Sequence, residues 1–247
     1  MDYKTIIYEK KGRVAVIRLN RPERKNAMSR QMSGEIKEAF DEAEKDREVG
    51  AVVLTGGPDC FCAGADLKEV DASGSGDEPI EPGMGEKIRY LTKPTIAAIG
   101  GYCIAGGIEI ALDCDIRIAS EEALIADRHT KMGLLGIGGG LVALPRLIGP
   151  GLAKELIFTG DFIDSKEAYR IGLVNHVYPK DKFIDEAIEL AQRIASNPPE
   201  TLRMAKKAIE IGLQMSRSEA MRHAEICNDE LKASAEYKER VAKFVKK

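Results

Sequence analysis

The N-terminal half of the chain alternates short apolar runs with turn-forming residues. Two β-branched runs, at residues 3–8 and 14–19, are separated by Lys11-Gly12, which predicts an opening β-hairpin. Three further apolar runs are short and predict buried strands, at residues 51–54, 95–99 and 115–119.

A helical period appears between these runs. Ser29 is a favourable N-cap for a helix that continues to about Arg47, because apolar residues after it return every three or four positions. The apolar face of this helix consists of Met32, Ile36, Ala39, Phe40 and Ala43. A shorter helix is expected to begin near Gly106, between the last two predicted strands.

Strands become rare in the last third of the chain. Residues 180–247 predict four helices, with breaks at Asn197-Pro198-Pro199 and near Ser216. Strands and helices that alternate and then give way to a helical tail indicate an α/β core followed by a helical subdomain. We therefore expect a core at residues 1–195 that carries the active site, and a helical region at residues 196–247. The apolar positions of this tail suit packing within the chain or contact with another subunit.

The composition is that of a globular protein. The chain has 247 residues, of which 44% are hydrophobic and 31% charged, enough for a sizeable core without disulfide bonds or a structural metal. The net charge of −3 argues against nucleic acid as a partner. Residues 95–112 are mostly apolar, but four glycines and Glu109 interrupt them, so no membrane segment is expected.

The cysteines and the N-terminus predict a cytoplasmic protein. The five cysteines lack the paired spacing of a zinc site, and the close pair Cys60-x-Cys62 is expected to be two small apolar residues in a reducing compartment. The first residues contain no apolar signal region. Residues 71–85, rich in glycine, serine, proline and acidic residues, predict a surface loop that serves as a linker or as a lid beside a site.

Several common binding and catalytic motifs are missing from the sequence. It contains neither G-x-G-x-x-G after a strand nor G-x-x-x-x-G-K-[ST], which argues against a dinucleotide cofactor and a phosphate-binding loop. The G-x-S-x-G motif of α/β-hydrolases is missing too. The three histidines, His129, His176 and His223, are too few for a histidine-rich metal site. We therefore expect neither a metal nor a bound cofactor.

Three segments carry the candidate chemistry. In residues 61–67 (FCAGADL), small residues lead into a short helix and let a ligand approach the peptide N–H groups. A glycine-rich turn at residues 100–107 then opens a helix whose first turn carries Glu109. The backbone amides at the start of this helix suit an oxyanion. Glu109 is either a general base or a residue that only complements the helix dipole. In residues 126–140, His129 precedes a glycine-rich apolar stretch and is either structural or an acid–base group beside an acyl pocket.

Together and in this order, these segments resemble the enoyl-CoA hydratase/isomerase (crotonase) family. The resemblance starts at residues 19–28 (LNRPERKNAM), continues through Thr159-Gly160-Asp161 and Gly172-Leu173-Val174, and ends at residues 244–247. It implies a crotonase-like spiral of ββα units, whose C-terminal helices form the trimerisation region of a homotrimer or hexamer. It also implies an acyl-CoA thioester as the substrate, so coenzyme A is part of the substrate and not a cofactor.

The resemblance further implies roles for individual residues. In the family two backbone N–H groups bind the thioester oxygen, and by motif position these belong to Ala65 and Gly106. Polarising the carbonyl makes the α-proton of a thioester acidic and opens the β-carbon to attack by water. The residues that the motifs place along coenzyme A are Ala63, Asp66, Leu67 and Lys68 in the channel, and Arg24, Lys25 and the weaker candidate Lys247 at the phosphates.

One catalytic position departs from the family's standard hydratases, which use two glutamates. Glu109 matches the first, whereas the second position, four residues before Gly133, is His129. Histidine exchanges protons near neutral pH, so Glu109 and His129 can share the acid–base work. Asp127 and Arg128 are expected to point elsewhere on an extended segment.

The sequence therefore predicts an enzyme, first of all an enoyl-CoA hydratase in fatty acid metabolism with Glu109 activating water. Two alternatives keep the fold and change the reaction: double-bond isomerisation by a single base, or hydrolysis of a cyclic oxo-acyl-CoA. A third, a non-catalytic acyl-CoA or RNA-binding relative, is disfavoured by the presence of Glu109 and the lack of a basic excess.

Overall fold

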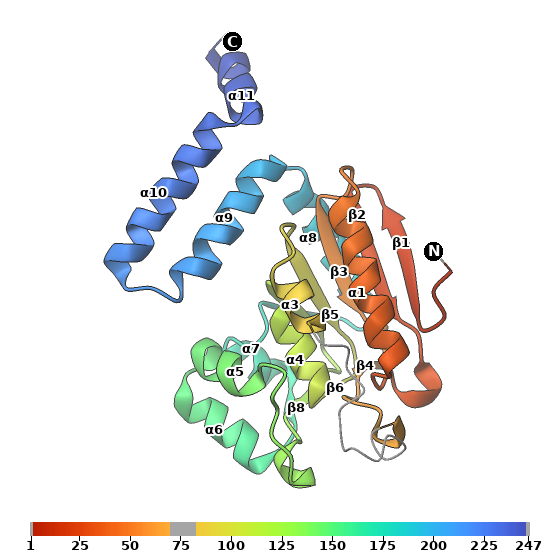
Figure 1. Ribbon diagram of the computed structural model, residues 1–247. Coiled ribbons are helices and arrows are strands. Elements are labelled where there is room, and N and C mark those ends of the chain that lie inside the picture. Colours follow the sequence, from red (N-terminus) through yellow and green to blue (C-terminus); the bar gives the residue numbers. More distant parts are fainter. Residues whose placement is uncertain (1, 70–82, 246–247) are drawn as a thin grey trace.

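The computed structural model describes residues 2–69 and 83–245 (Figure 1). Their strands form two sheets of mainly parallel strands, with helices packed around them. Most of the loop predicted at residues 71–85 lies outside the described residues, and Lys247 lies outside them too.

The larger sheet has six strands in the order β1-β2-β3-β5-β7-β10. Their bounds are β1 Ile6–Lys11, β2 Val14–Leu19, β3 Ala51–Thr55, β5 Thr95–Ile99, β7 Ile116–Ser120 and β10 His176–Tyr178. β1 and β2 form the antiparallel hairpin predicted from the sequence, and the other neighbours are parallel. β1 continues past the predicted end at Tyr8, because its pairing with β2 extends to Lys11 opposite Val14.

The smaller sheet has four strands in the order β4-β6-β8-β9. Their bounds are β4 Cys60–Cys62, β6 Tyr102–Ile104, β8 Leu124–Ala126 and β9 Ile163–Asp164. The first three strands are parallel, and β9 is antiparallel to β8. Strands of two or three residues carry too little of the alternating pattern to be recognised in a sequence.

The chain passes from the larger sheet to the smaller one three times. β3 is followed by β4, β5 by β6, and β7 by β8, and successive pairs are neighbours in both sheets. A helix follows each pair: α3 (Met84–Arg89), α4 (Gly106–Asp113) and α5 (Gly140–Ile148). These are the turns of a spiral built from ββα units, as the family resemblance implied.

Helices cover both faces of the larger sheet. Alternate residues of β2 belong to two separate clusters: Ala15 and Ile17 pack with α1 (Arg30–Lys45), whereas Val14 and Val16 pack with α8 (Phe183–Ala195). The expected apolar face of α1 is buried. Its predicted cap is confirmed, since the Ser29 hydroxyl accepts a hydrogen bond from the Met32 N–H at 3.0 Å.

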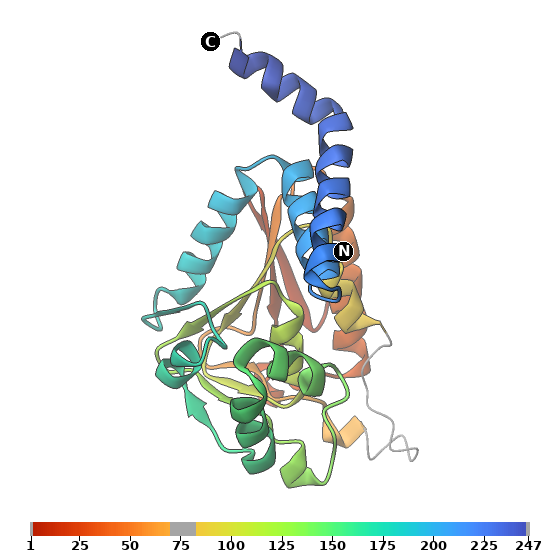
Figure 2. The ribbon, with the colours of Figure 1, turned by 90° about the vertical axis from the view of Figure 1, so that its left-hand side faces the viewer.

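The four helices predicted after residue 180 are all present. The first, α8, packs on the sheet, and the others are α9 Pro199–Gly212, α10 Arg217–Ala233 and α11 Ala235–Val245. Figures 1 and 2 show α10 and α11 extending away from the core, while α9 and α10 lie side by side. Lys206 anchors α9 by donating to Asp115 Oδ2 at 2.8 Å and to the carbonyl of Lys93 at 3.2 Å.

The remaining described helices surround the smaller sheet and its loops. They are η1 Pro22–Arg24, η2 Thr130–Met132, α6 Pro150–Thr159 and α7 Ser165–Arg170. Within residues 2–69 and 83–245, none of the helices has both the length and the apolar character needed to cross a membrane.

Candidate active site

Glu109 lies at a point where the N-termini of two helices meet. It occupies the first turn of α4 and is only 5% exposed. Its Oε1 accepts a hydrogen bond of 3.1 Å from the N–H of Gly140, the first residue of α5. Both helix N-termini present partial positive charge to the carboxylate, which favours negative charge at this position.

His129 lies beside Glu109. It follows β8 and immediately precedes η2, and it is 7% exposed. Its Nε2 is 3.9 Å from Glu109 Oε2. The structure therefore brings together the two groups that the sequence predicted as an acid–base pair, although they lie 20 residues apart on different elements.

Asp127 binds the other ring nitrogen of His129, so the expectation that it points elsewhere is wrong. Asp127 Oδ1 is 2.7 Å from His129 Nδ1 and also accepts a hydrogen bond of 3.1 Å from the His129 backbone N–H. The expectation failed because the segment turns instead of staying extended: His129 has helical φ and ψ of −58° and −44°, and its backbone N–H bonds back to the Asp127 carboxylate, which keeps the two side chains together. Arg128 does point elsewhere, with its guanidinium carbon 5.2 Å from the centroid of the Phe162 ring.

The glycine-rich segment at residues 133–140 packs directly on this pair. A Cβ atom at Gly138 would lie 2.6 Å from Glu109 Oε2, and one at Gly136 would lie 2.8 Å from His129 Nδ1. Both distances are shorter than a Cβ atom tolerates, so any other residue at these positions would displace the Glu109 carboxylate or the His129 ring. The hydrophobic residues between the glycines are exposed: Leu134, Leu135 and Ile137.

Two adjoining loops hold the predicted oxyanion donors. A Cβ built on Gly106 would lie 3.7 Å from the Ala65 nitrogen, and one on Gly64 would lie 3.3 Å from the Gly106 nitrogen. The two amides are therefore close together. In the described part of the chain, neither amide donates to a backbone or side-chain acceptor.

The direction of the Ala65 amide follows from a parallel bridge with Met28. This bridge uses the Gly64 carbonyl, which accepts from the Met28 N–H at 2.7 Å, and the Asp66 N–H, which donates to the Met28 carbonyl at 2.8 Å. Successive peptide groups of an extended strand point in opposite directions. The Ala65 N–H therefore points away from Met28, which leaves it available to a ligand.

The Gly106 amide is held by an unusual residue before it. Ala105 has φ of 51° and ψ of −117°, a conformation that costs energy for a residue with a side chain. Its N–H donates to the Ala126 carbonyl at 3.0 Å, which ties the turn to the strand leading towards His129. Such strain is typical of functional sites, where the surrounding structure holds the chain in one conformation.

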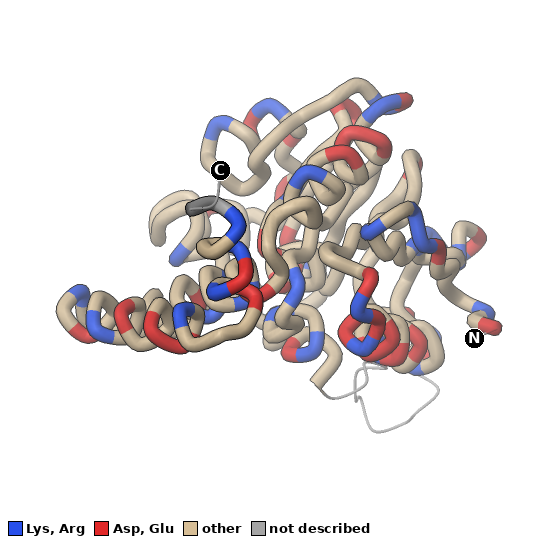
Figure 3. Tube along the Cα trace, turned by 90° about the horizontal axis from the view of Figure 1, so that it is seen from above, with Lys and Arg blue, Asp and Glu red and all other residues tan. Residues whose placement is uncertain are grey.

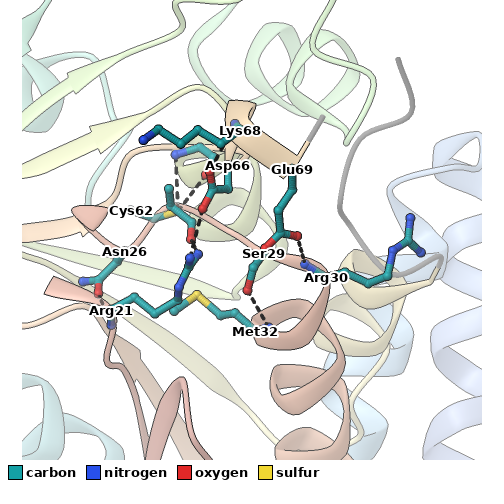
Figure 4. A network of polar contacts seen from close by, with 11 residues as sticks. Arg21, Asn26, Ser29, Arg30, Met32, Cys62, Asp66, Lys68 and Glu69 are labelled. Carbon is teal, nitrogen blue, oxygen red and sulfur yellow. Dashed lines mark hydrogen bonds and ion pairs between the residues drawn. The ribbon is translucent and has the colours of Figure 1, made fainter. Parts of the chain in front are cut away.

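Among the predicted coenzyme A residues, Asp66 already has partners. Figure 4 shows its carboxylate between Arg21, whose Nη2 is 3.0 Å from Oδ2, and the Lys68 N–H, which donates to Oδ1 at 3.2 Å. Asp66 is 7% exposed. Its side chain holds the loop in place, and Arg21 is a supporting residue that the sequence analysis missed.

Lys25 and Ala63 adjoin, since the Ala63 N–H donates to the Lys25 carbonyl at 3.1 Å. The Lys25 ammonium lies 5.7 Å from the centroid of the Tyr102 ring and borders a cavity of about 350 Å³. Arg24, Leu67 and Lys68 are exposed. The structure thus gathers the predicted coenzyme A residues on two neighbouring loops, at residues 24–25 and 63–68.

The cysteines near this site are buried and free. Burial raises the pKa of the Cys60 thiol to about 11 and that of Cys62 to about 12, so both are neutral at physiological pH. This fits the interpretation of the pair as small apolar residues. Among the described residues, no group of three or more histidine, cysteine, aspartate or glutamate side chains is placed to hold a metal ion.

The chain is similar to several known proteins. Residues 9–247 match the family model described as enoyl-CoA hydratase/isomerase. The chain is 37% identical over 252 residues to the short-chain-enoyl-CoA hydratase of Clostridium acetobutylicum, covering 100% of this chain and 97% of that protein. Among solved structures it is similar to the enoyl-CoA hydratase of Bacillus anthracis, with a TM-score of 0.90, 33% identity and coverage of 98% and 96%. A second, from Mycobacterium tuberculosis H37Rv, has a TM-score of 0.90, 32% identity and coverage of 98% and 96%. These matches confirm the predicted crotonase-like fold.

Proposed function

Because the chain belongs to the enoyl-CoA hydratase/isomerase family, we propose that it adds water to the double bond of a 2-enoyl-CoA or catalyses the reverse dehydration. The observation that carries this proposal is the buried pair of Glu109 and His129, whose reactive atoms are 3.9 Å apart. Two groups that can each exchange a proton suit a reaction in which one proton leaves water and another reaches carbon.

The backbone amides of Ala65 and Gly106 stabilise the developing charge in this mechanism. When the water oxygen bonds to the β-carbon, the electrons of the double bond move through the α-carbon onto the thioester oxygen. Both amides donate to that oxygen, and each well-placed donor of this kind lowers the barrier by about 3 kcal/mol. Their proximity and their lack of acceptors within the described residues support this role.

Glu109 and His129 move the protons. Glu109 takes a proton from water as the water oxygen attacks the β-carbon. That proton then reaches the α-carbon of the enolate by way of His129 Nε2, which regenerates both groups and completes the addition of one water molecule. His129 is the second group beside the reacting atoms that can carry a proton, at the position of the second glutamate in the family's hydratases. The hydrogen bond from Gly140 orients the Glu109 carboxylate for this task.

Coenzyme A binds along the two neighbouring loops in this proposal. Lys25 and Arg24 contact its phosphates, and Ala63, Leu67 and Lys68 line the channel for the adenine and pantetheine. Asp66 contributes indirectly, because its ion pair with Arg21 holds the loop in shape. Calorimetry with acetyl-CoA and with the acetyl thioester of N-acetylcysteamine tests this part, and equal affinities would contradict it.

The C-terminal helices, residues 196–247, provide subunit contacts in a homotrimer or hexamer. Several large apolar side chains on these helices are exposed in the single chain, among them Ile209 (61%), Leu213 (77%), Met221 (59%) and Ile226 (56%). Patches of this kind mark protein interfaces.

Acidic and basic residues are interspersed along the same helices (Figure 3), which gives no support to an RNA-binding function. The free thiols of the buried cysteines suit a cytoplasmic location.

A panel of acyl-CoAs followed by mass spectrometry tests the reaction itself. Hydration predicts that a 2-enoyl-CoA gains the mass of one water molecule. An unchanged mass with a shifted double bond would identify an isomerase instead. Ring opening of a cyclic oxo-acyl-CoA would identify the hydrolase. Binding of every acyl-CoA in the panel without turnover would contradict an enzymatic function.

A further inference from the structure

Asp127 is a buried carboxylate whose position is not explained by stability alone. It is 0% exposed, and its Oδ2 is buried without a hydrogen-bond partner among the described residues. The cations nearest to it in the sequence are engaged elsewhere: Arg128 lies over the Phe162 ring, and Lys131 pairs with Asp161 at 2.7 Å. A buried carboxylate that no lysine or arginine of the described residues neutralises is unfavourable, so its presence requires another explanation.

The contacts of Asp127 are directed at one residue. Its Oδ1 receives both the backbone N–H and the Nδ1 of His129, at 3.1 and 2.7 Å. We propose that Asp127 is a positioning residue that holds the His129 ring with its proton on Nδ1 and directs the Nε2 lone pair towards Glu109. The tautomer of His129 does not depend on the proposed function; only the predicted effect on catalysis rests on it.

The tautomer follows from hydrogen-bond chemistry. An ionised carboxylate only accepts hydrogen bonds, so Nδ1 must be the donor in the contact with Asp127. A neutral imidazole carries a single N–H, and the other nitrogen is then an acceptor. In the neutral ring His129 Nε2 is therefore an acceptor, and it is the nitrogen that lies 3.9 Å from Glu109 Oε2.

This arrangement makes Asp127 and His129 together equivalent to a second carboxylate. The site presents two acceptors, Glu109 Oε2 and His129 Nε2, at a separation that the two O–H groups of one water molecule can span. With the opposite tautomer, Nε2 would donate instead and the water molecule would lose one acceptor. Asp127 also stabilises the imidazolium that forms when His129 accepts a proton.

Nuclear magnetic resonance tests the tautomer directly. The chain has three histidines, so ¹⁵N-histidine labelling gives few signals, and His129→Gln, His176→Gln and His223→Gln assign them. At a pH where the ring is neutral, we expect protonated Nδ1 and unprotonated Nε2 for His129. Asp127→Leu, which has similar size but no acceptor, should abolish this preference. Asp127→Asn should retain part of it, because its carbonyl oxygen can replace Oδ1.

Kinetics on a 2-enoyl-CoA that the enzyme hydrates separates positioning from general support of the fold. Asp127→Leu should lower kcat roughly 10²-fold with little change in KM. The kcat of Asp127→Asn should lie between the values of Asp127→Leu and the wild type. In a His129→Gln background, Asp127→Leu should add less than about a twofold loss, because Asp127 acts through His129. The matched control is Asp161→Asn, which removes an exposed carboxylate that pairs with the same segment and should leave kcat unchanged.

Three results would overturn the inference: a wild-type His129 protonated on Nε2, an unchanged tautomer in Asp127→Leu, or equal losses of kcat from Asp127→Leu with and without His129. If Asp127→Leu does not fold, the wild-type tautomer and the Asp127→Asn variant still decide. The tautomer is measured without substrate. It therefore tests the positioning role even if no 2-enoyl-CoA is hydrated, a result that would contradict the proposed function alone.

Discussion

Replacing Gly138 with alanine places a methyl group against the carboxylate of Glu109. An ideal Cβ at this position lies 2.6 Å from Glu109 Oε2 and 2.9 Å from its Cδ. Ordinary van der Waals contact begins at 3.4 Å, so the two must separate by 3.4 − 2.6 = 0.8 Å. The backbone φ of Gly138 lies outside the left-handed region, so the expected effect comes from this contact and not from backbone strain.

The size of the effect on the rate follows from this displacement. A shift of about 1 Å in a reacting group costs about 10²-fold in rate. We therefore expect kcat of Gly138→Ala to fall roughly 30- to 100-fold on a 2-enoyl-CoA. KM should change little, because the proposed coenzyme A loops, at residues 24–25 and 63–68, do not include this contact.

Steady-state hydration kinetics measure kcat and KM of the variant, and thermal unfolding measures its melting temperature. Gly151→Ala is the matched control, because a Cβ at Gly151 meets no atom within 4 Å. It should retain full activity and an unchanged or slightly higher melting temperature, since alanine favours the helix. Full activity in Gly138→Ala would refute the reasoning, because the position of the Glu109 carboxylate would then not control the rate.

Further predictions concern proton transfer, loop support and assembly. Glu109→Gln should reduce turnover by about 10²–10⁴-fold while calorimetry still shows coenzyme A binding; full activity would overturn its catalytic assignment. His129→Gln should cause a comparable loss and remove one limb of the pH–rate profile near neutrality, whereas a loss of stability alone would make His129 structural. Arg21→Met leaves the nearly buried Asp66 without its cation and should destabilise the fold by about 2 kcal/mol, which thermal unfolding would show; an unchanged melting temperature would contradict this account. Light scattering at micromolar concentration should give a trimer or hexamer, and a stable monomer would contradict the proposed interface.

Much of the fold could be predicted because its signals are local. The helix after Ser29 and the hairpin at Lys11-Gly12 follow from capping, turn chemistry and apolar period, which are properties of neighbouring residues. The short strands of the smaller sheet, such as β9, could not be predicted. Two or three residues do not establish a period, and these strands form because partners from other parts of the chain supply their hydrogen bonds.

The candidate site divides in the same way. Glu109 and His129 were found from the sequence because their residue types and motif positions are local properties. The hydrogen bond from Gly140 to Glu109 was not, because it depends on how α5 packs against α4. The ion pair between Asp66 and Arg21 was not found either, because the two residues are remote in sequence.

The sequence by itself determined the α/β core, the four C-terminal helices and the types of group available for chemistry, while the spiral was implied by the family resemblance. Only the tertiary structure decided which of these groups meet and with which atoms. Asp127 shows the reason most directly: on an extended strand its side chain would lie about 7 Å from that of His129, two residues on, but the chain turns here and brings Oδ1 to 2.7 Å from Nδ1. The turn leads into η2, which packs against α6, an element about 20 residues further along the chain. Contacts between elements distant in sequence depend on the whole fold, and no local pattern records them.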